Sequence, residues 1–349
     1  MPLFSSQDQL IFEVPRHLKD KRIDSTLATL LREKYPEEKT ISRAVLTRVI
    51  NEGKVLLNGA PVLARSLVAT HDQISFAGNI FGGQKQLTPA YGDIAVTVLF
   101  ENDRLLVLDK GAGVQMHHGG SHPGTTLSEW LLGHYPFLKD VGGDPLRPGI
   151  VHRLDRDTSG VVVIAKDNET FQALKKAFQD RLVDKKYVAL VYGQLSALEG
   201  KIDASLIRHP GDLKRRAVDT EEYTGTLPGN TRTALTLYRV LARYAEYDVV
   251  ELSPKTGRTH QIRVHMTYLG HPVVGDKLYA FKEVKRSNLL APNRHMLHAG
   301  SLSFELFGEK YQFQSPLPED FRQVLMSLDE TQVSSYDDEA LKTCPPRFA

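Results

Sequence analysis

A cluster of charged residues directly before a buried strand constrains this chain more than any other feature of its sequence. Pro148 and Gly149 interrupt the backbone, residues 152–157 read His-Arg-Leu-Asp-Arg-Asp, and residues 161–164 form the β-branched run Val-Val-Val-Ile. Such an apolar run is typical of a buried strand. Charged side chains so close to a core must be paired or hydrogen-bonded, because an isolated buried charge is very costly. The stretch therefore indicates either a site with reactive carboxylates or a surface loop whose alternating charges pair with one another.

The strand-forming runs farther along the chain define the fold class. Residues 171–178 have helical periodicity, and strands are predicted at 185–193, 233–241 and 247–252, the last two joined by a short polar turn. Consecutive strands with short connections pair in the antiparallel sense. We therefore expect an α+β domain built on a central, mostly antiparallel mixed sheet, and not a doubly wound one.

The N-terminal part of the chain predicts a small separate module. Apolar residues recur at helical spacing after Asp24 and again after Ser42, and Asn58-Gly59 is a strong signal for a two-residue hairpin turn. The predicted organisation is a helix-helix-hairpin domain at 12–78, a glycine- and proline-containing linker at 79–93, a larger domain at 94–325 and an acidic tail at 326–349.

Charge is distributed unevenly along the chain, although the net charge is only +2. Residues 13–66 hold 11 Lys/Arg against 7 Asp/Glu, whereas residues 317–349 hold 3 against 7, so an acidic tail masks a basic front. The single cysteine, Cys344, fits a reducing compartment. Because the sequence has no basic-then-apolar leader and no run approaching about 18 apolar residues, we expect a cytoplasmic protein without membrane contact.

Three histidines near the middle of the chain raise the question of a metal site. His117, His118 and His122 lack the i, i+4 spacing of helical metal ligands and lie in a glycine-rich stretch. We therefore interpret them as part of a solvated loop. We expect neither a metal nor an organic cofactor.

Two motifs and a strand tyrosine carry a resemblance to a known family. His-Arg-Leu-Asp at 152–155 with Thr-Ser-Gly at 158–160 resembles the signature of the RluA-type RNA pseudouridine synthases, which implies that Asp155 is the catalytic nucleophile. The run Lys-Thr-Gly-Arg-Thr-His-Gln-Ile-Arg-Val-His-Met at 255–266 resembles the second diagnostic motif, and this implies that Arg263 pairs with the catalytic aspartate. Tyr187 is similar to the family's active-site tyrosine, which stacks on the flipped uracil and is the candidate proton acceptor.

The same resemblance implies a set of residues that bind the substrate RNA. Arg153 corresponds to the arginine that enters the space left by the flipped nucleotide. Arg208 and Lys214 belong to a basic cluster that either contacts phosphates or is an ordinary solvated loop. The complete predicted substrate-binding set is His152, Arg153, Arg208, Lys214, Arg258 and His260.

The N-terminal module resembles the alpha-L RNA-binding motif found in the fourth small-subunit ribosomal protein. The resemblance rests on Arg-Ile-Asp at 22–24, Ser-Arg at 42–43 and the hairpin at 53–59. It implies that Arg43, Arg48 and Lys54 contact RNA phosphates and so supply salt-sensitive affinity without sequence readout. The alternative is that these three residues are solvated surface charges.

These features together predict an RNA pseudouridine synthase that acts on large-subunit ribosomal RNA as a monomer. Transfer RNA is the alternative substrate, and a non-catalytic RNA-binding ribosome assembly factor is the alternative outside enzymology. The second alternative is disfavoured because Asp155, Tyr187 and Arg263 are all present. Asp155 and Asp157 also allow a glycoside hydrolase pair, but that hypothesis leaves the basic RNA-binding blocks unexplained.

Overall fold

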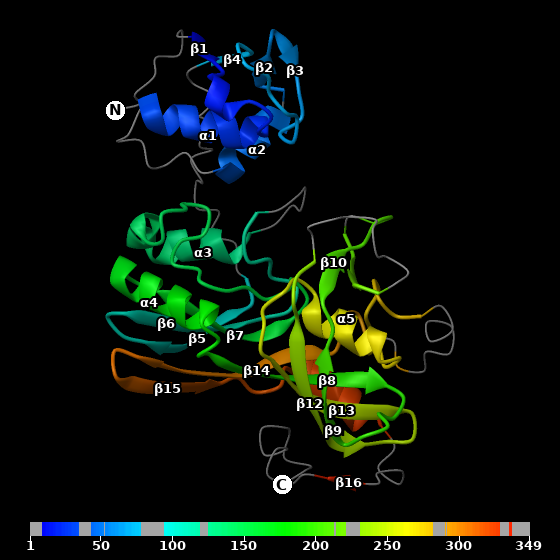
Figure 1. Cartoon of the computed structure of the whole chain (residues 1–349). Coiled ribbons are helices and arrows are strands. Elements are labelled where there is room, and N and C mark those ends of the chain that lie inside the picture. The colour runs from blue at the N-terminus through cyan, green and yellow to red at the C-terminus, as the bar shows by residue number, and fades with distance from the viewer. Residues whose placement is uncertain are drawn as a thin grey trace. The chain divides into compact units, whose positions relative to one another are not determined.

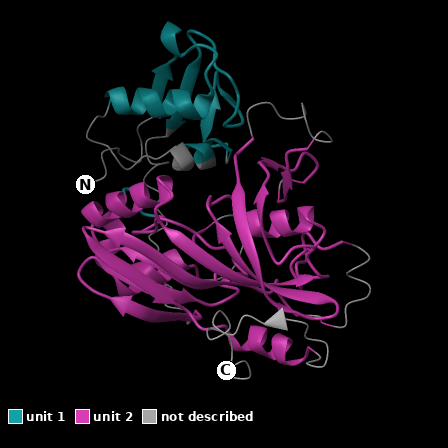
Figure 2. Ribbon diagram, turned by 60° about the horizontal axis from the view of Figure 1, so that its bottom comes forward, with its two compact units in different colours: residues 1–90, 143–145 teal, residues 91–142, 146–349 magenta. Residues whose placement is uncertain are grey.

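The computed structural model describes residues 9–34, 43–51, 53–77, 94–118, 125–212, 214–220, 231–281, 290, 292–328 and 335–336. The chain divides into two compact units, residues 1–90 with 143–145 and residues 91–142 with 146–349 (Figure 2). Each unit has a hydrophobic core of its own.

The described part of the first unit contains two α-helices, a short 3-10 helix and a small antiparallel sheet with strand order β1-β4-β2-β3. Asn58 and Gly59 both have positive φ (50° and 82°), the conformation that a tight turn between two strands requires. The predicted helices and hairpin are therefore present, and β1 is an additional strand. The elements are β1 (Gln9–Glu13), η1 (Arg16–Leu18), α1 (Ile23–Lys34), α2 (Arg43–Asn51), β2 (Val55–Leu57), β3 (Ala60–Pro61) and β4 (Gln73–Ala77).

In the described part of the second unit, ten strands form one sheet with the main order β16-β12-β13-β8-β14-β7-β6-β5. Neighbouring strands there are antiparallel except β7 and β14, which are parallel. The prediction of a mostly antiparallel mixed sheet is confirmed. The strands are β5 (Val96–Glu101), β6 (Leu105–Lys110), β7 (Ser159–Ala165), β8 (Asp184–Tyr192), β9 (Glu199–Asp203), β12 (Leu235–Arg243), β13 (Tyr247–Pro254), β14 (Leu297–Leu306), β15 (Glu309–Gln314) and β16 (Ser335–Tyr336).

The helices of the second unit lie beside this sheet, α3 and α4 at its β5-β6-β7 end and α5 beside β13 (Figure 1). A separate two-stranded sheet, β10 with β11, projects next to α5. These elements are α3 (Leu127–His134), η3 (Pro136–Asp140), α4 (Asn168–Gln179), β10 (Leu206–Arg208), β11 (Arg216–Val218), α5 (Gln261–Tyr268) and α7 (Glu319–Met326).

Strand β7 anchors the charged loop that the sequence singles out. Every residue of β7 is buried, because β6 and β14 flank the strand and α4 packs against it with Phe171, Leu174 and Ala177. The polar loop before β7 therefore lies next to β14, because the first residue of β7, Ser159, is the register partner of His298. This placement brings the loop close to segments more than 100 residues away in sequence.

Several predictions fall outside the described residues. They concern the linker at 79–93, His122, most of the tail at 326–349, and the side chains of Arg43 and Arg48, whereas Lys54 is described and exposed. Within the described ranges, no helix is both long and apolar enough to cross a bilayer. Those ranges also hold no group of three His, Cys, Asp or Glu side chains arranged for a metal.

Candidate active site

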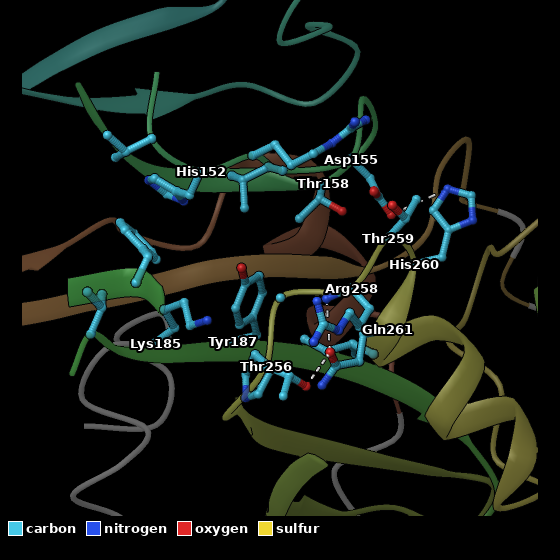
Figure 3. Close-up of a pocket in the computed structure, with 18 of the residues that line it drawn as sticks. His152, Asp155, Thr158, Lys185, Tyr187, Thr256, Arg258, Thr259, His260 and Gln261 are labelled. Carbon is cyan, nitrogen blue, oxygen red and sulfur yellow. Dashed lines mark hydrogen bonds and ion pairs between the residues drawn. The ribbon is translucent and has the colours of Figure 1, made fainter. Parts of the chain in front are cut away.

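The second unit contains a pocket of about 660 Å³. Most of its lining comes from four segments: the loop before β7, the C-terminal end of α4, the start of β8, and residues 254–263 at the entry to α5 (Figure 3). His117 and Leu297 also line it. The three predicted catalytic residues Asp155, Tyr187 and Arg263 all line this pocket, although they come from three separate elements. Fold topology thus brings together the motifs that are far apart in the chain.

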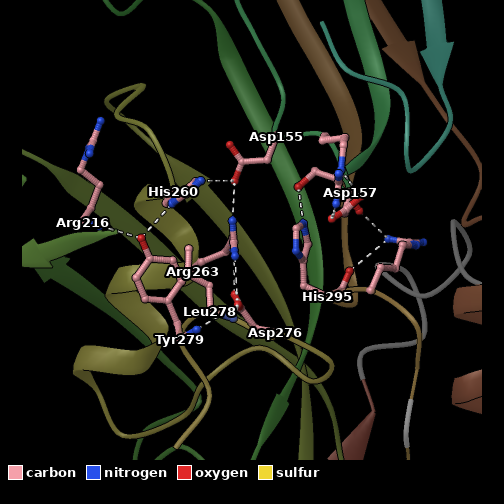
Figure 4. Close-up of polar contacts among 12 residues, drawn as sticks. Asp155, Asp157, Arg216, His260, Arg263, Asp276, Leu278, Tyr279 and His295 are labelled. Atoms are coloured by element: carbon pink, nitrogen blue, oxygen red, sulfur yellow. Dashed lines mark hydrogen bonds and ion pairs between the residues drawn. The ribbon is translucent and has the colours of Figure 1, made fainter. Parts of the chain in front are cut away.

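One carboxylate oxygen of Asp155 is held and the other is available. Asp155 Oδ2 accepts a hydrogen bond from Arg263 Nη1 at 3.1 Å, so the predicted ion pair is present (Figure 4). His260 Nε2 lies 3.8 Å from the same oxygen. Among the described residues, no hydrogen-bond donor contacts Oδ1, and the Asp155 side chain keeps 17% of its surface exposed. An oxygen that is free in a pocket can react with a bound molecule.

Arg263 is itself fixed by a second carboxylate behind it. Arg263 Nε and Nη2 donate to the two oxygens of buried Asp276 at 2.6 and 2.9 Å. Burial alone would lower the pKa of Arg263, but the hydrogen bonds and charge of Asp276, followed by those of Asp155, raise it. Asp276 also accepts the backbone N–H groups of Leu278 and Tyr279 at 2.9 and 3.0 Å. The guanidinium therefore stays charged and points one nitrogen at Asp155.

The hydrogen on His260 can be assigned from its neighbours. Tyr279 Oη accepts the Arg216 N–H at 2.8 Å and lies 2.8 Å from His260 Nδ1 (Figure 4). A hydrogen on Nε2 would face the Asp155 carboxylate favourably, whereas a lone pair there would be repelled. The Tyr279 hydroxyl therefore donates to Nδ1, and Nε2 carries the hydrogen. Burial lowers the pKa of His260 against the opposing effect of Asp155, so the ring is neutral at pH 7.

Tyr187 points its hydroxyl into the pocket from β8 (Figure 3). Burial, and then the negative charge of Asp155, raises the pKa of this hydroxyl. It is therefore protonated at neutral pH. The raised pKa argues against a proton-acceptor role of Tyr187 in the resting site, because a protonated hydroxyl is a poor base. The position of the ring is compatible with stacking on a base.

The loop that carries Asp155 is held from below by buried polar groups. Lys110 is fully buried, and its Nζ donates to the carbonyl oxygens of Gly111, Val114 and Arg156 at 2.9 to 3.0 Å. Burial lowers the pKa of Lys110 to about 7. Arg294 donates to the Asp157 carbonyl at 3.3 Å. These contacts tie the loop to β6 and to the segment before β14.

His295 adds a contact whose effect on stability depends on pH. Its Nε2 lies 2.8 Å from Thr158 Oγ1, and burial lowers its pKa to about 4. The fold therefore favours the neutral ring, whereas the unfolded chain takes up a proton below about pH 6.5. The resulting stability is lost as the pH falls from about 6.5 toward 4, and we expect the free energy of unfolding to drop by roughly 2 kcal/mol at pH 5.

Urea unfolding of wild type and His295→Gln between pH 7 and 5 measures this effect. The substitution should make the fall in stability smaller by about 2 kcal/mol, while His152, whose pKa burial also lowers, still contributes to the remaining fall. His134→Gln, at an exposed position, should leave the fall unchanged. A fall of the same size in His295→Gln would show that His295 is not its source.

The predicted substrate-binding residues have different surroundings. Arg153 and Arg258 are exposed at the pocket, and Arg258 Nε donates to the Thr233 carbonyl at 3.2 Å. His152 stacks on Phe178 with 4.7 Å between ring centroids. Its Nε2 accepts the Val163 N–H at 3.0 Å, and burial lowers its pKa to about 3. His152 is thus a neutral ring with one nitrogen already occupied.

Arg208 and Lys214 do not line the pocket. Arg208 is the last residue of β10 and Lys214 lies between β10 and β11. Both side chains are exposed, and the adjoining Arg216 contacts the site through its backbone. Their predicted role in RNA binding stays a prediction.

Sequence reasoning assigned no role to several residues that organise the site. Asp276 and Tyr279 lie in the run Gly-His-Pro-Val-Val-Gly-Asp-Lys-Leu-Tyr at 270–279, which resembles a family motif but suggests no function by itself. Lys110 and His295 had no recognisable signal, because their burial depends on contacts with distant segments.

Comparisons with known proteins agree with these features. Residues 104–268 match the family described as RNA pseudouridylate synthase. The Xanthomonas campestris protein named ribosomal large subunit pseudouridine synthase D is 36% identical, over 94% of this chain and 95% of that protein. The Bacillus subtilis protein named uncharacterized RNA pseudouridine synthase YlyB is 32% identical, over 92% of this chain and 98% of that protein. The solved structure of human RNA pseudouridylate synthase domain containing 1 has a similar fold, with a TM-score of 0.56, 25% identity, and coverage of 72% of this chain and 95% of that one.

Proposed function

Since this chain belongs to the RNA pseudouridylate synthase family, and is therefore an isomerase that converts uridine in RNA to pseudouridine, we propose that its substrate is large-subunit ribosomal RNA and its nucleophile Asp155. The substrate proposal is supported by the relatives from Xanthomonas campestris and Pseudomonas aeruginosa, both named ribosomal large subunit pseudouridine synthase D. The second matches at 34% identity over 93% of this chain.

The reaction requires few protein groups, because uridine and pseudouridine are isomers with the same atoms. The bond between N1 of uracil and C1′ of ribose breaks, a bond between C5 and C1′ forms, and one hydrogen leaves C5 while N1 acquires one. No oxidant, reductant or energy source enters this balance. The minimum set is a nucleophile, a fixed cation beside it, a group that takes the hydrogen from C5, and a surface that holds the detached base.

The observation that carries the assignment of Asp155 is its pairing with Arg263. Arg263 binds Oδ2 and leaves Oδ1 without a donor among the described residues, so the carboxylate is oriented and has a free oxygen that can attack. Asp276 in turn holds the Arg263 guanidinium in place by accepting two hydrogen bonds from it. We assign Arg263 as the residue that orients the nucleophile.

Tyr187 and Arg153 complete the proposed site. The Tyr187 ring offers a face on which a flipped uracil can stack, and its protonated hydroxyl can donate a hydrogen bond to the base. Arg153 is exposed at the pocket, two residues before Asp155, where it can enter the gap that the flipped nucleotide leaves. Arg258 and His260 are proposed to contact the same nucleotide.

Pseudouridine mapping tests the substrate. Total RNA from cells that lack this protein, and from cells that regain it, is treated with carbodiimide and read by reverse-transcription stops. We expect one or a few sites in large-subunit ribosomal RNA to disappear and to return with the wild-type protein. Loss of sites in transfer RNA alone would replace the proposed substrate with the alternative one.

Removal of the Tyr279 hydroxyl tests the assigned state of His260. Tyr279→Phe keeps the ring against the Arg263 guanidinium, which lies 5.0 Å from the ring centroid, but removes the donor to His260 Nδ1. We expect kcat to fall by about tenfold to a hundredfold with little change in KM, because the imidazole loses its orientation. Single-turnover kinetics measure this change. The matched control is Tyr268→Phe, since Tyr268 is 54% exposed on α5; equal rates for the two variants would exclude a role for the hydroxyl.

A further inference from the structure

The pocket continues beyond the space that a flipped uridine requires. At about 660 Å³ it is large enough for a drug-sized molecule, and it extends from Asp155 past Tyr187. Lys185 and His152 lie on the far side of Tyr187 from Asp155 (Figure 3). We call this part the far lobe. We define it by the pocket-lining residues from the C-terminal end of α4 to the start of β8: Lys175, Phe178, Gln179, Arg181, Val183 and Lys185.

Lys185 is a half-buried cation of the far lobe for which no acceptor is found among the described residues. It lies two residues before Tyr187 in β8, so both side chains are on one face of the strand and both line the pocket. Among the described residues, no acceptor or carboxylate bonds to Lys185 Nζ, and the nearest recorded contact is the Phe178 ring, 5.9 Å away at its centroid. Burial, with help from Lys255, lowers its pKa although Asp184 opposes this.

Two lysines near Lys185 do have carboxylate partners, in contrast to Lys185 itself. Lys186, on the other face of β8, pairs with Glu251 at 3.3 Å, and Lys255 pairs with Asp184 at 2.9 Å. An ammonium group that is partly removed from water without an anion is destabilising. Lys185 nevertheless places a positive charge in the pocket, where a nonpolar residue would pack without that cost.

The charge of the pocket lining favours an anionic occupant. Asp155 is the single acidic residue among the described residues of the lining, and Arg263 neutralises it. The lining also contains eight Lys or Arg residues: Arg147, Arg153, Lys175, Arg181, Lys185, Lys255, Arg258 and Arg263. Lys175 and Arg181 are exposed, so they extend the positive surface from Lys185 to solvent.

We propose that the far lobe binds a backbone phosphate of the RNA strand next to the target uridine, with half-buried Lys185 as its ligand and exposed Arg181 at its rim. The proposal rests on the proposed function, because RNA supplies a phosphate at a fixed distance from the flipped base. A phosphodiester carries one negative charge and two acceptor oxygens, which match an ammonium and a guanidinium. Binding there would orient the strand while the base lies between Tyr187 and Asp155.

A double-mutant cycle between protein and RNA tests this proposal. The probe is a synthetic RNA stem-loop that contains the uridine identified by mapping, together with versions in which single phosphates on either side are replaced by neutral methylphosphonates. The proteins are wild type, Lys185→Met and Lys185→Arg, and the matched control is Lys186→Met on the opposite face of the same strand. Equilibrium binding is measured at several salt concentrations, and circular dichroism checks folding.

We expect one methylphosphonate to weaken wild-type binding by about tenfold, and Lys185→Met to weaken binding of the unmodified RNA by the same factor. The two changes together should cost no more than either alone. The slope of log K against log salt should fall by about 0.7 for Lys185→Met, because one phosphate contact is lost. Lys185→Arg should bind nearly as wild type does, and Lys186→Met should leave the cycle unchanged.

Additive losses at every flanking phosphate would overturn the proposal, as would a Lys185→Met variant that binds normally but reacts slowly, because Lys185 would then act on the base. Pseudouridine formation by wild-type protein on the unmodified stem-loop separates this result from a failure of the proposed function. If wild type modifies the RNA while the cycle is additive, only the phosphate site is wrong. If wild type does not modify the RNA that contains the mapped uridine, the proposed function is wrong, and the phosphate site falls with it because it rests on that function.

Discussion

Asp155→Asn is expected to lower the rate of pseudouridine formation by roughly 10⁴-fold or more while the protein remains folded. The amide has the size of the carboxylate but carries no negative charge, so it cannot attack the nucleoside. Folding should be preserved because Arg263 keeps its two hydrogen bonds to Asp276 when the Asp155 charge is removed. The loss should therefore appear in kcat and not in the binding of RNA.

The release of tritium from RNA labelled at C5 of uridine measures this rate, because the hydrogen on C5 is displaced when C5 bonds to ribose. Asp157→Asn is the matched control. Asp157 lies two residues away and pairs with Arg156 at 2.9 Å, and it does not line the pocket. We expect it to stay within about tenfold of wild type. Equal losses in the two variants would mean that the loop is disturbed and that Asp155 is not the nucleophile.

Arg263→Gln is expected to damage both stability and activity. Asp276 is fully buried at its side chain, and Arg263 is its ion-pair partner at 2.6 Å. Removing the guanidinium leaves this carboxylate without a compensating charge, which should cost about 3–5 kcal/mol of unfolding free energy. Asp155 also loses the cation that orients it, so the residual folded protein should react roughly 10²- to 10³-fold more slowly.

Urea unfolding and single-turnover kinetics measure the two effects separately. Arg258→Gln is the control, because Arg258 belongs to the same motif but is exposed, and we expect it to unfold within about 0.5 kcal/mol of wild type. The double variant Arg263→Gln with Asp276→Asn should recover part of the lost stability but not the activity, since the buried charge is gone while Asp155 remains unpaired. Recovery of activity in the double variant would contradict the proposed role of Arg263.

The contacts that connect the site residues could be predicted only in part from the sequence. The motifs around Asp155 and Arg263 correctly predicted an ion pair between residues 108 positions apart. They did not reveal that Asp276 holds the other side of the guanidinium, or that Tyr279 links His260 to the backbone of β11. Those contacts depend on how the segment after α5 packs against α5 and β11. The local sequence does not specify this packing.

Tyr187 and His152 illustrate the difference between the presence of a residue and its state. Their positions in the pocket follow from the motifs, but the raised pKa of Tyr187 and the lowered pKa of His152 follow from burial. Burial depends on which segments cover a side chain. The proton-acceptor role for Tyr187 therefore could not be judged before the fold was available.

By itself, the sequence determined the family, the mostly antiparallel sheet and the candidate residues for the chemistry, because motifs and hydrophobic periodicity are local properties of the chain. Only the tertiary structure decided the parallel pairing of β7 with β14, the burial of Lys110 under the loop of Asp155, and the lack of a partner for Lys185 among the described residues. Each of these depends on contacts between segments distant in sequence. A charge is reactive, structural or ready to bind a ligand according to what surrounds it in space.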